Sequence, residues 1–369
     1  MKTIHVAWDN CFAQRNQTGT GAYARQLLKH LSPRQDLRLD VFQGYPAGAR
    51  PNARIHRALQ AMGRMAWTHI ALPVRLWKFD VLHSPAFVAP LACPCPSVIT
   101  VHDVTHLFYP SHFAGQWVWY MKSVVPATIK SANAIICGSE HSKRDIVTAY
   151  GLPPERVRVI PYGVDHQRFT PAAVLDRNWA QSLGLRENYI LHVGELTHRK
   201  NIPTLLRAVD RLRSQGKWGT KQLVLAGPDN PAMPGAAEIR ETIHELDLKN
   251  DVLLAGRVPD EHLSGLYTHA KLLVMPSFYE GFGFPVVESM AAGTPVVASN
   301  TSSLPEVAGN AAVLVPPSDV EAMASAISDV MEKPALASEL RARGLLQAQT
   351  FNWERTAAET MAVYRDVAQ

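Results

Sequence analysis

Residues 272–298 read LLVMPSFYEGFGFPVVESMAAGTPVVA and contain the clearest secondary-structure pattern of the chain. An apolar run, Leu272–Met275, leads through a turn with two glycines into a helical pattern that has Pro285 near its first position. A second apolar run, Pro295–Ala298, follows the helical pattern closely. Continuous apolarity is typical of strands that are covered on both faces, so the stretch predicts a strand–helix–strand unit of a parallel sheet.

The same alternation of strand-like runs and helical patterns extends through most of the chain. Other strand-like runs are Val6–Trp8, Leu39–Phe42, Val81–His83, Val98–Val101, Ala134–Cys137, Val157–Ile160, Tyr189–Val193, Gln222–Ala226, Val252–Ala255 and Ala312–Val315. Helical patterns cover Ala22–Leu28, Asn201–Ser214, Ala236–Leu246, Glu261–His269, Pro285–Ala292 and Trp353–Val367. The alternation predicts an α/β protein built from two doubly wound, Rossmann-like domains that face each other across a cleft.

A segment rich in proline and glycine, Pro161–Pro171, marks the expected hinge between the two domains. We expect an amino-terminal, acceptor-binding domain over residues 1–165 and a carboxyl-terminal, donor-binding domain over residues 166–350. The last helix, over residues 351–369, is expected to return toward the amino-terminal domain.

Composition narrows the class of protein. Among 369 residues, 37 basic and 32 acidic side chains leave a formal charge of +5, which is too weak and too evenly spread to indicate nucleic-acid binding. Four cysteines do not make a disulfide framework, and Cys93 and Cys95 have no second Cys/His pair at zinc-site spacing. We find neither a signal peptide nor a run long enough for a transmembrane helix, and we expect a cytoplasmic protein.

The glycine turn has the residues for an anion site. Free backbone N–H groups at the helix start attract anions, and Gly281 and Gly283 let a ligand approach the main chain. Glu288, one turn into the helix, can accept hydrogen bonds from sugar hydroxyls, and Glu280 precedes the turn. The alternative is a strand–turn–helix without a binding function, in which both glutamates are solvated.

Two adjacent cations, Arg199 and Lys200, also follow a strand and precede a helix. At the carboxyl end of a parallel strand they can neutralise the charge that develops on a diphosphate leaving group. We expect both side chains to be exposed in the empty cleft. Taken alone, the pair could equally be solvated surface residues.

Together these segments resemble the retaining glycosyltransferases of the GT-B fold, family 4, which include glycogen-synthase-like and mannosyltransferase-like enzymes of bacterial polysaccharide biosynthesis. The resemblance runs nearly end to end. Its segments are Thr18–Tyr23, Ile160–Asp165, Gly194–Asn201, Gly256–Pro259 and the stretch from Glu280 through Glu288 to Val297. The chain departs from the common pattern at Tyr162, where asparagine is frequent, and at Thr20, where an aliphatic residue is usual.

The resemblance implies a role for each matching position. Arg199 and Lys200 match the cations that grip the donor diphosphate, and Glu288 matches the carboxylate that binds the ribose hydroxyls. The amides at Phe282 and Gly283, with Glu280 alongside, match those that hold the donor sugar. The remaining donor-binding positions are Gly19 and Gly21 in a glycine loop after the first strand, Arg257 and Val258 at the nucleobase, and Gly281, Phe284 and Val287 in the turn and helix.

The same resemblance implies the chemistry. A hexose would pass from a UDP- or GDP-sugar to a glycan, lipid-linked or small-molecule acceptor with retention, by front-face attack. Because Arg199 and Lys200 supply fixed positive charge, neither a metal ion nor another cofactor is expected. His102, directly after the strand Val98–Val101, matches a histidine near the sugar and the departing oxygen. We therefore expect His102, Arg199, Lys200 and Glu280 to be the catalytic residues.

Two other functions fit the same architecture. A sugar-nucleotide epimerase would need a close acid/base pair acting on the sugar and no acceptor groove. A non-catalytic sugar-binding protein would not need Arg199, Lys200, Glu280 and Glu288 together. A retaining phosphorylase is a third, weaker alternative, because no segment resembles a pyridoxal-phosphate lysine site.

The acceptor side is less defined. The stretch Ala53–Asp80 interleaves basic residues with tryptophans and other apolar residues. Its cations are Arg54, Arg57, Arg64, Arg75 and Lys78. Such a stretch fits peripheral association with the inner face of the cytoplasmic membrane, and it fits equally a pair of surface helices with snorkelling cations.

Overall fold

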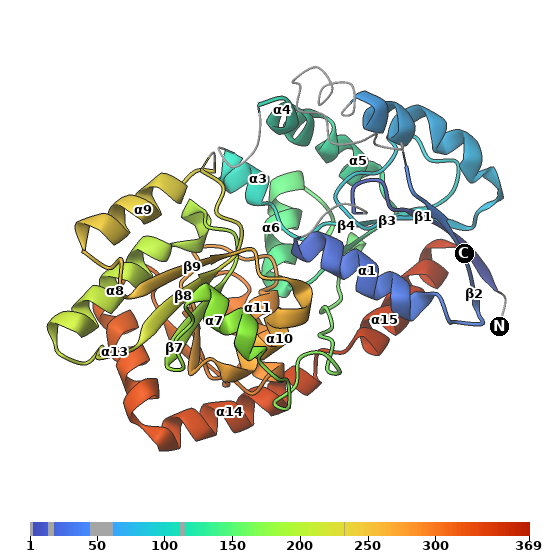
Figure 1. The fold of residues 1–369 in the computed structure, drawn as a ribbon. Coiled ribbons are helices and arrows are strands. Elements are labelled where there is room, and N and C mark those ends of the chain that lie inside the picture. Colours follow the sequence, from blue (N-terminus) through green and yellow to red (C-terminus); the bar gives the residue numbers. More distant parts are fainter. Residues whose placement is uncertain (1–2, 14–17, 45–61, 111–114, 232) are drawn as a thin grey trace. The chain divides into compact units, whose positions relative to one another are not determined.

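The computed structural model describes residues 3–13, 18–44, 62–110, 115–231 and 233–369 (Figure 1). They form two compact units, one of residues 1–163 with 353–369 and the other of residues 164–352. Each unit contains a six-stranded sheet in which every pair of neighbouring strands is parallel. The predicted α/β fold with two doubly wound sheets is confirmed. Within the described residues no helix is both long and apolar enough to span a membrane.

The first sheet has the order β2-β1-β3-β4-β5-β6. Its strands are β1 (Ile4–Asp9), β2 (Leu37–Phe42), β3 (Val81–Ser84), β4 (Ser97–Thr100), β5 (Ala134–Cys137) and β6 (Val157–Val159). Strands β3, β4 and β5 are buried along their whole length, as their continuous apolarity predicts. The chain moves outward from β1 to β2 and then crosses to β3 on the other side, which creates a topological switch point between β1 and β3.

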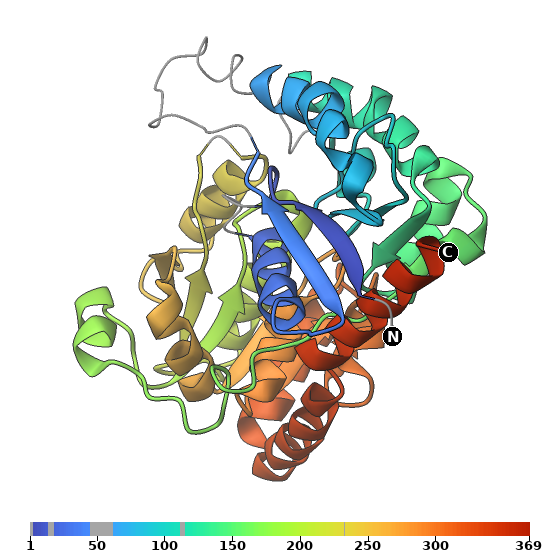
Figure 2. The same cartoon turned by 90° about the vertical axis from the view of Figure 1, so that its right-hand side faces the viewer.

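Helices cover this sheet on both sides. In chain order they are α1 (Gly19–Leu31), the π-helical turn η1 (Trp67–Ala71), the 3₁₀ helix η2 (Pro73–Lys78), α3 (Thr105–Phe108), α4 (Gly115–Ser123), α5 (Val125–Ser131), α6 (Glu140–Tyr150), the short turn η4 (Pro154–Arg156) and, from the end of the chain, α15 (Trp353–Val367). Helix α15 lies beside α1 (Figure 2). Trp353 stacks near His30 of α1, so the last helix completes the amino-terminal core.

The second sheet has the order β12-β11-β10-β7-β8-β9. Its strands are β7 (Tyr189–Val193), β8 (Gln222–Ala226), β9 (Val252–Gly256), β10 (Leu272–Met275), β11 (Val296–Ser299) and β12 (Val313–Val315). The chain runs from β7 outward to β9 and then returns to β10 on the opposite side of β7. This sheet therefore has its switch point between β7 and β10.

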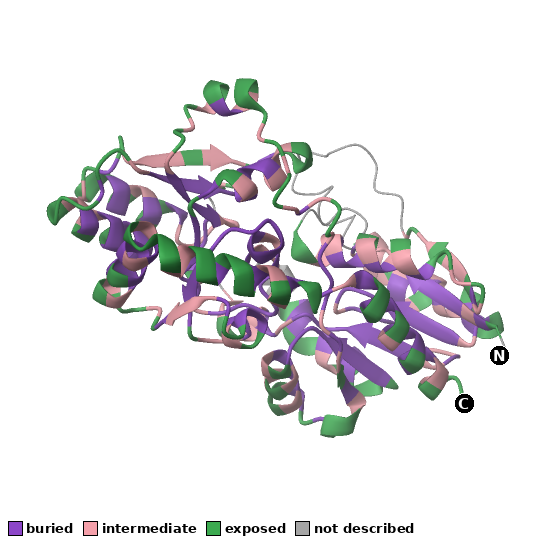
Figure 3. Cartoon of the chain, turned by 90° about the horizontal axis from the view of Figure 1, so that it is seen from below, coloured by how far each residue is buried: buried purple, intermediate pink, exposed green. Residues whose placement is uncertain are grey.

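The helical elements of the second unit are α7 (Arg177–Leu183), the turn η5 (His198–Lys200), α8 (Ile202–Ser214), α9 (Ala236–Glu245), α10 (Asp260–His269), α11 (Phe284–Ala291), α12 (Leu304–Ala308), α13 (Val320–Glu332) and α14 (Pro334–Gln349). Helices α8 and α13 pack together against the sheet through an apolar cluster that includes Leu205, Val209, Met323 and Ile327. In Figure 3 the strands are mostly buried, whereas the outer faces of the helices are exposed.

Candidate functional site

The predicted cations and the glutamate turn meet at the switch point of the second sheet. Arg199 and Lys200 lie in η5, just beyond the carboxyl end of β7, and Glu280 lies just beyond the carboxyl end of β10. Strands β7 and β10 are neighbours, with Leu191 in register with Leu273. Loops that follow neighbouring parallel strands emerge at the same edge, and in doubly wound sheets ligands bind where those strands diverge.

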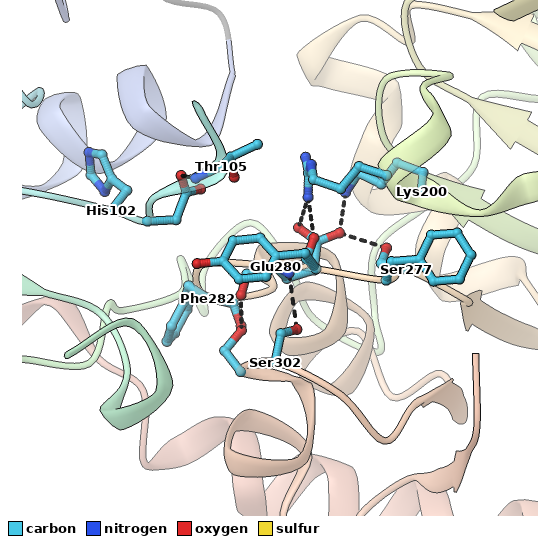
Figure 4. Close-up of polar contacts among 12 residues, drawn as sticks. His102, Thr105, Lys200, Ser277, Glu280, Phe282 and Ser302 are labelled. Atoms are coloured by element: carbon cyan, nitrogen blue, oxygen red, sulfur yellow. Dashed lines mark hydrogen bonds and ion pairs between the residues drawn. The ribbon is translucent and has the colours of Figure 1, made fainter. Parts of the chain in front are cut away.

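At this edge the Glu280 carboxylate bridges the two cations (Figure 4). Lys200 Nζ lies 2.6 Å from Glu280 Oε1, and Arg199 Nη1 lies 2.9 Å from Oε2. Arg199 also donates to the main-chain carbonyl of Tyr279, while the amide of Phe278 donates to the carbonyl of Arg199. The two loops are therefore tied together by side chains and by main chain.

Burial and charge oppose each other in this cluster. Burial by itself raises the pKa of Glu280, but the positive charges of Arg199 and Lys200 outweigh it and lower that pKa to about 2. Burial lowers the pKa of Lys200, and the charge of Glu280 opposes that shift. Glu195 interacts with the same two cations, so the formal charges here are +1, +1, −1 and −1, and an anionic ligand would be held by the positions of Arg199 and Lys200 rather than by a net charge.

The exposure expected for the two cations is wrong. The Lys200 residue is only 5% exposed, and the side chain of Arg199 is 21% exposed. Lys200 is covered because the main chain of Gly194 passes directly over it: a Cβ atom at Gly194 would lie 2.8 Å from Lys200 Cε. The ammonium group is thus held by packing as well as by its ion pair.

Three serines that sequence analysis did not single out hold Glu280 in place. Ser277 Oγ donates to Glu280 Oε1 at 2.7 Å, and the Glu280 amide donates to Ser302 Oγ at 3.0 Å (Figure 4). Ser303 Oγ lies 2.9 Å from the carbonyl oxygens of both Glu280 and Phe282. Ser302 has a φ of +55°, a conformation that is costly for a residue with a Cβ and that this bond helps to retain.

The glycine turn ends at the start of α11, as predicted. Gly283 caps the helix with a φ of +104°, a conformation that favours glycine. Phe282 is buried, with its ring 5.2 Å from that of Phe284 and 5.7 Å from that of Phe351. These ring contacts fix the course of the main chain from Gly281 to Phe284, so its polar groups keep a defined direction.

Glu288 and Val287 lie one turn into α11. Val287 is fully buried, so its side chain contributes to the packing of the core. Glu288 is partly exposed, and its Oε2 accepts a hydrogen bond of 2.8 Å from the hydroxyl of Tyr267. Burial raises the pKa of Glu288, against the lowering effects of Tyr267 and Arg168.

Arg257 and Val258 follow β9, two strands away from β7 on the same sheet edge. Arg257 is exposed, whereas Val258 is buried. Gly256, at the end of the strand, has a φ of +63° that turns the chain at this point. The structure does not bring these two residues into the Glu280 cluster.

The remaining predicted residues lie in the amino-terminal unit. Gly19 and Gly21 were expected in a loop, but α1 begins at Gly19, so both occupy the first turn of the helix. A helix start still leaves backbone N–H groups without helical partners, so the change of element preserves an anion-binding geometry. His102 follows β4 and is buried, with a pKa that burial lowers to about 4.

Metal-ligating side chains do not gather in the part of the chain that the structure describes. It contains no group of three or more His, Cys, Asp or Glu side chains suited to a metal ion. The thiols of Cys93 and Cys95 lie 3.7 Å apart, beyond a disulfide bond length.

Comparison with known proteins identifies the class. A family model described as "Glycosyl transferases group 1" matches residues 176–346, and one described as "Glycosyltransferase Family 4" matches residues 18–168. O-antigen chain mannosyltransferase B of Escherichia coli is 31% identical over 306 residues, which are 82% of this chain and 77% of that protein. The MMP α-(1→4)-mannosyltransferase of Mycolicibacterium hassiacum is 33% identical over 230 residues, 61% of this chain and 52% of that protein.

Solved structures agree in fold. Sucrose-phosphate synthase from Thermosynechococcus elongatus superposes with a TM-score of 0.76 at 22% identity and covers 98% of both chains. Anabaena HepE, solved in complex with UDP and glucose, gives 0.74 at 18% identity and covers 98% of this chain and 100% of that one. The two sheets thus have the GT-B fold. Among proteins of that fold, the chain belongs to the group 1 glycosyltransferases, with an amino-terminal half of family 4 type.

Proposed function

We propose that this glycosyltransferase moves a mannosyl group from a nucleoside-diphosphate sugar onto a hydroxyl of a glycan or lipid-linked acceptor, with retention and without a metal ion. The observation that carries the proposal is the cluster of Arg199, Lys200 and Glu280 at the switch point of the second sheet. Mannose is proposed because O-antigen chain mannosyltransferase B, which matches 82% of this chain, is a mannosyltransferase; other relatives are D-inositol 3-phosphate glycosyltransferases. The complex of HepE with UDP and glucose supports a nucleotide-sugar donor.

In this proposal the cluster stabilises the leaving diphosphate. The bond from the anomeric carbon to the phosphate oxygen breaks, and the acceptor oxygen bonds to the same face of that carbon. The departing phosphate oxygen takes the acceptor proton. Arg199 and Lys200 neutralise the charge that develops on that oxygen, and Glu280 keeps both cations in position before the donor binds.

The other site residues would bind the rest of the donor. Glu288 would accept hydrogen bonds from the ribose hydroxyls, and the main chain at Arg257 and Val258 would meet the base. The turn Gly281–Phe284 would hold the sugar through its amides. His102, Gly19 and Gly21 would contribute from the amino-terminal unit.

An acceptor linked to lipid fits an apolar patch on that unit, formed by Ile70, Val74 and Trp77. These side chains are 68%, 70% and 79% exposed, whereas Leu72 and Leu76 between them are buried. The η1–η2 segment therefore has apolar side chains both on its buried face and on its exposed face. Exposed apolar side chains grouped in this way mark interaction sites.

Charge around the patch favours an anionic bilayer. Residues 62–79 contain Arg64, Arg75 and Lys78 but no aspartate or glutamate. Basic residues around exposed aromatic and aliphatic side chains are typical of segments that lie in a membrane interface. The other cations of the predicted membrane stretch, Arg54 and Arg57, lie outside the described residues. We propose that the patch holds the protein on the inner face of the cytoplasmic membrane.

A donor panel tests the enzymatic proposal. UDP- and GDP-sugars are incubated with the protein with and without an acceptor lipid extract, in excess EDTA, and nucleotide release and product mass are measured. We expect release of nucleoside diphosphate, a mannoside whose anomeric configuration matches that of the donor, and full activity in EDTA. An epimerised nucleotide sugar without a glycoside, or no release with any donor, would refute the proposal.

Vesicle sedimentation tests the membrane proposal separately. The protein should bind vesicles of phosphatidylglycerol and phosphatidylcholine at low salt and bind less as salt screens the charges. The Ile70→Ser/Trp77→Ser variant should lose most of that binding. Val174→Ser, which changes an apolar residue that is 82% exposed in the other unit, is the matched control. Equal binding by both variants would remove the patch from consideration.

A further inference from the structure

Both ring nitrogens of His102 are occupied within the amino-terminal unit. Nε2 lies 3.1 Å from the carbonyl oxygen of Pro85, and Nδ1 lies 2.8 Å from the hydroxyl oxygen of Tyr162. The histidine is 8% exposed, and its ring is flanked edge-on by Tyr23 and Phe87 at centroid distances of 5.0 and 5.4 Å. The imidazole is therefore confined to one orientation.

The two contacts determine which nitrogen carries the proton. A carbonyl oxygen only accepts, so Nε2 must donate its N–H to Pro85. Burial lowers the pKa of His102 to about 4, so the ring is neutral near pH 7 and Nδ1 has a lone pair. Burial also raises the pKa of Tyr162 well above its usual value, which keeps the hydroxyl protonated as the donor to Nδ1.

The side chain of Tyr162 is held in position by the packing around its ring. It is 1% exposed, with its ring 4.4 Å from that of Tyr23, and a Cβ atom at Gly138 would lie 2.8 Å from two of its ring carbons. Only a residue without a side chain at position 138 leaves room for the ring. Asparagine, which is frequent at position 162 in the family that the sequence resembles, is shorter and does not present a hydroxyl at this distance.

We infer that Tyr162 is a positioning residue for His102: its hydroxyl holds Nδ1 as the acceptor nitrogen, so the ring stays the neutral Nε2–H tautomer when another oxygen takes the place of the Pro85 carbonyl. His102 then offers a hydrogen-bond donor, not a free base, to an oxygen of the donor sugar. That oxygen would replace the Pro85 carbonyl as the acceptor of the same N–H. The inference rests on the proposed function for the role of His102, whereas the tautomer itself is independent of that function.

Side-chain NMR of ¹⁵N-histidine-labelled protein tests the tautomer. The His102 signals, assigned by their loss in His102→Gln, should show a protonated Nε2 and an unprotonated Nδ1. In Tyr162→Phe the Pro85 carbonyl still keeps Nε2 protonated, and the Nδ1 signal should shift to that of a lone pair without a hydrogen bond. The matched control is Tyr150→Phe, because Tyr150 makes the same kind of bond, 2.9 Å long, to Nε2 of His106 in the same unit. It should leave the His102 signals unchanged.

An unaltered His102 pattern in Tyr162→Phe would overturn the inference. If that variant does not fold, Gly138→Ala serves instead, because it retains the hydroxyl but crowds the ring that carries it. It should likewise shift the Nδ1 signal, and a signal that stays in place would count equally against the inference.

A double-mutant cycle tests the consequence for transfer. Tyr162→Phe should lower turnover about tenfold with the affinity for bare nucleoside diphosphate unchanged, the scale of one hydrogen bond. In a His102→Gln background it should cause no further loss. Additive losses would show that Tyr162 acts independently of His102. Wild-type turnover in His102→Gln would instead contradict the role of His102 in the proposed function, while the NMR result would still decide the tautomer.

Discussion

At the scale of single residues, the carboxylate of Glu280 organises the candidate site. It holds Arg199 and Lys200 from opposite oxygens and accepts a hydrogen bond from Ser277, while Ser302 and Ser303 bond to the main chain of the same residue. A charged pair that is removed from water depends on such complete hydrogen bonding, because loss of either partner leaves a buried charge without compensation. Preorganised in this way, the cations need little rearrangement when a diphosphate arrives.

The first prediction concerns Arg199, whose removal leaves the Lys200–Glu280 pair intact. Arg199→Ala should lower turnover by about two to three orders of magnitude, the effect of losing one donor to a developing oxyanion. Its melting temperature should fall only moderately, because Lys200 still compensates the buried Glu280 carboxylate. Arg211→Ala, which breaks an exposed ion pair with Glu321 in the same unit, is the control and should retain full turnover. Similar turnover in both variants would contradict the assignment.

The second prediction concerns acid stability. The pKa of Glu280 is about 2 in the folded chain, against 4.5 for an unperturbed glutamate. The ionised carboxylate therefore contributes its full stabilisation above pH 4.5, and this stabilisation is lost as pH falls toward 2. The difference in free energy of unfolding between wild type and Glu280→Gln should therefore shrink between pH 5 and pH 3. Denaturant titrations at each pH measure it. A difference that is constant with pH would show that the carboxylate is not held by the two cations.

At the scale of elements, the strands were predictable and the supporting contacts were not. The observed bounds of β5, β7, β8 and β10 match the apolar runs, because burial on both faces of a parallel sheet leaves a continuous signal in sequence. The start of α1 was placed too late, because glycines indicate a loop more often than a first turn. Helix α14 has no apolar stripe that sequence reveals, because Leu340 is the one large side chain among its three buried residues, and the other two are Gly344 and Ala348.

In the candidate site, too, some features could be predicted from the sequence and others could not. Segments that follow neighbouring strands can be predicted to meet, because parallel strands end at one edge. The contacts of Ser302 and Ser303 with the Glu280 segment could not be predicted. They join positions more than 20 residues apart, and a serine in a sequence does not indicate which residue it will contact. Likewise, the burial of Lys200 depends on the path of Gly194, which no residue pattern reveals.

The third prediction concerns the cap of α11. Gly283→Ala should destabilise the fold by about 1–2 kcal/mol, because alanine resists a positive φ. It should also weaken binding of a bare nucleoside diphosphate in calorimetry, because the main chain of the turn shifts. Gly151→Ala, at the left-handed end of α6 with open space around it, should cost a similar amount of stability without affecting binding. Unchanged binding by both variants would place the nucleotide elsewhere.

At the scale of the whole molecule, the chain passes between the two units twice, near Gly163 and near Trp353. Helix α15 is bound firmly to the amino-terminal unit. Thr356 Oγ1 donates to the carbonyl of Pro161 at 2.8 Å, and the buried hydroxyl of Tyr364 bonds to Nδ1 of His83 on β3. Helix α15 is therefore a structural part of the amino-terminal unit.

The fourth prediction follows from that arrangement. A chain that ends at Asn352 loses the burial of Trp353 and Tyr364, each worth about 2–3 kcal/mol. Hydrogen exchange read by mass spectrometry should show faster exchange in β1, β3 and β4, while β7, β8 and β10 remain protected. Removal of the Arg365–Asp36 ion pair alone, with Arg365→Ala, is the control and should leave both sheets protected. Equal loss of protection in the two units would indicate a single cooperative unit.

The place of α15 also bears on how the protein is made. On the ribosome the segment 164–352 is synthesised before α15, so the second unit has its whole chain available while the first still lacks a helix of its core. The amino-terminal sheet, although translated first, therefore cannot reach its native packing before α15 has been made. During that interval the surface that Trp353 and Tyr364 later cover is open to chaperones, and ribosomes stalled just before codon 353 should display it.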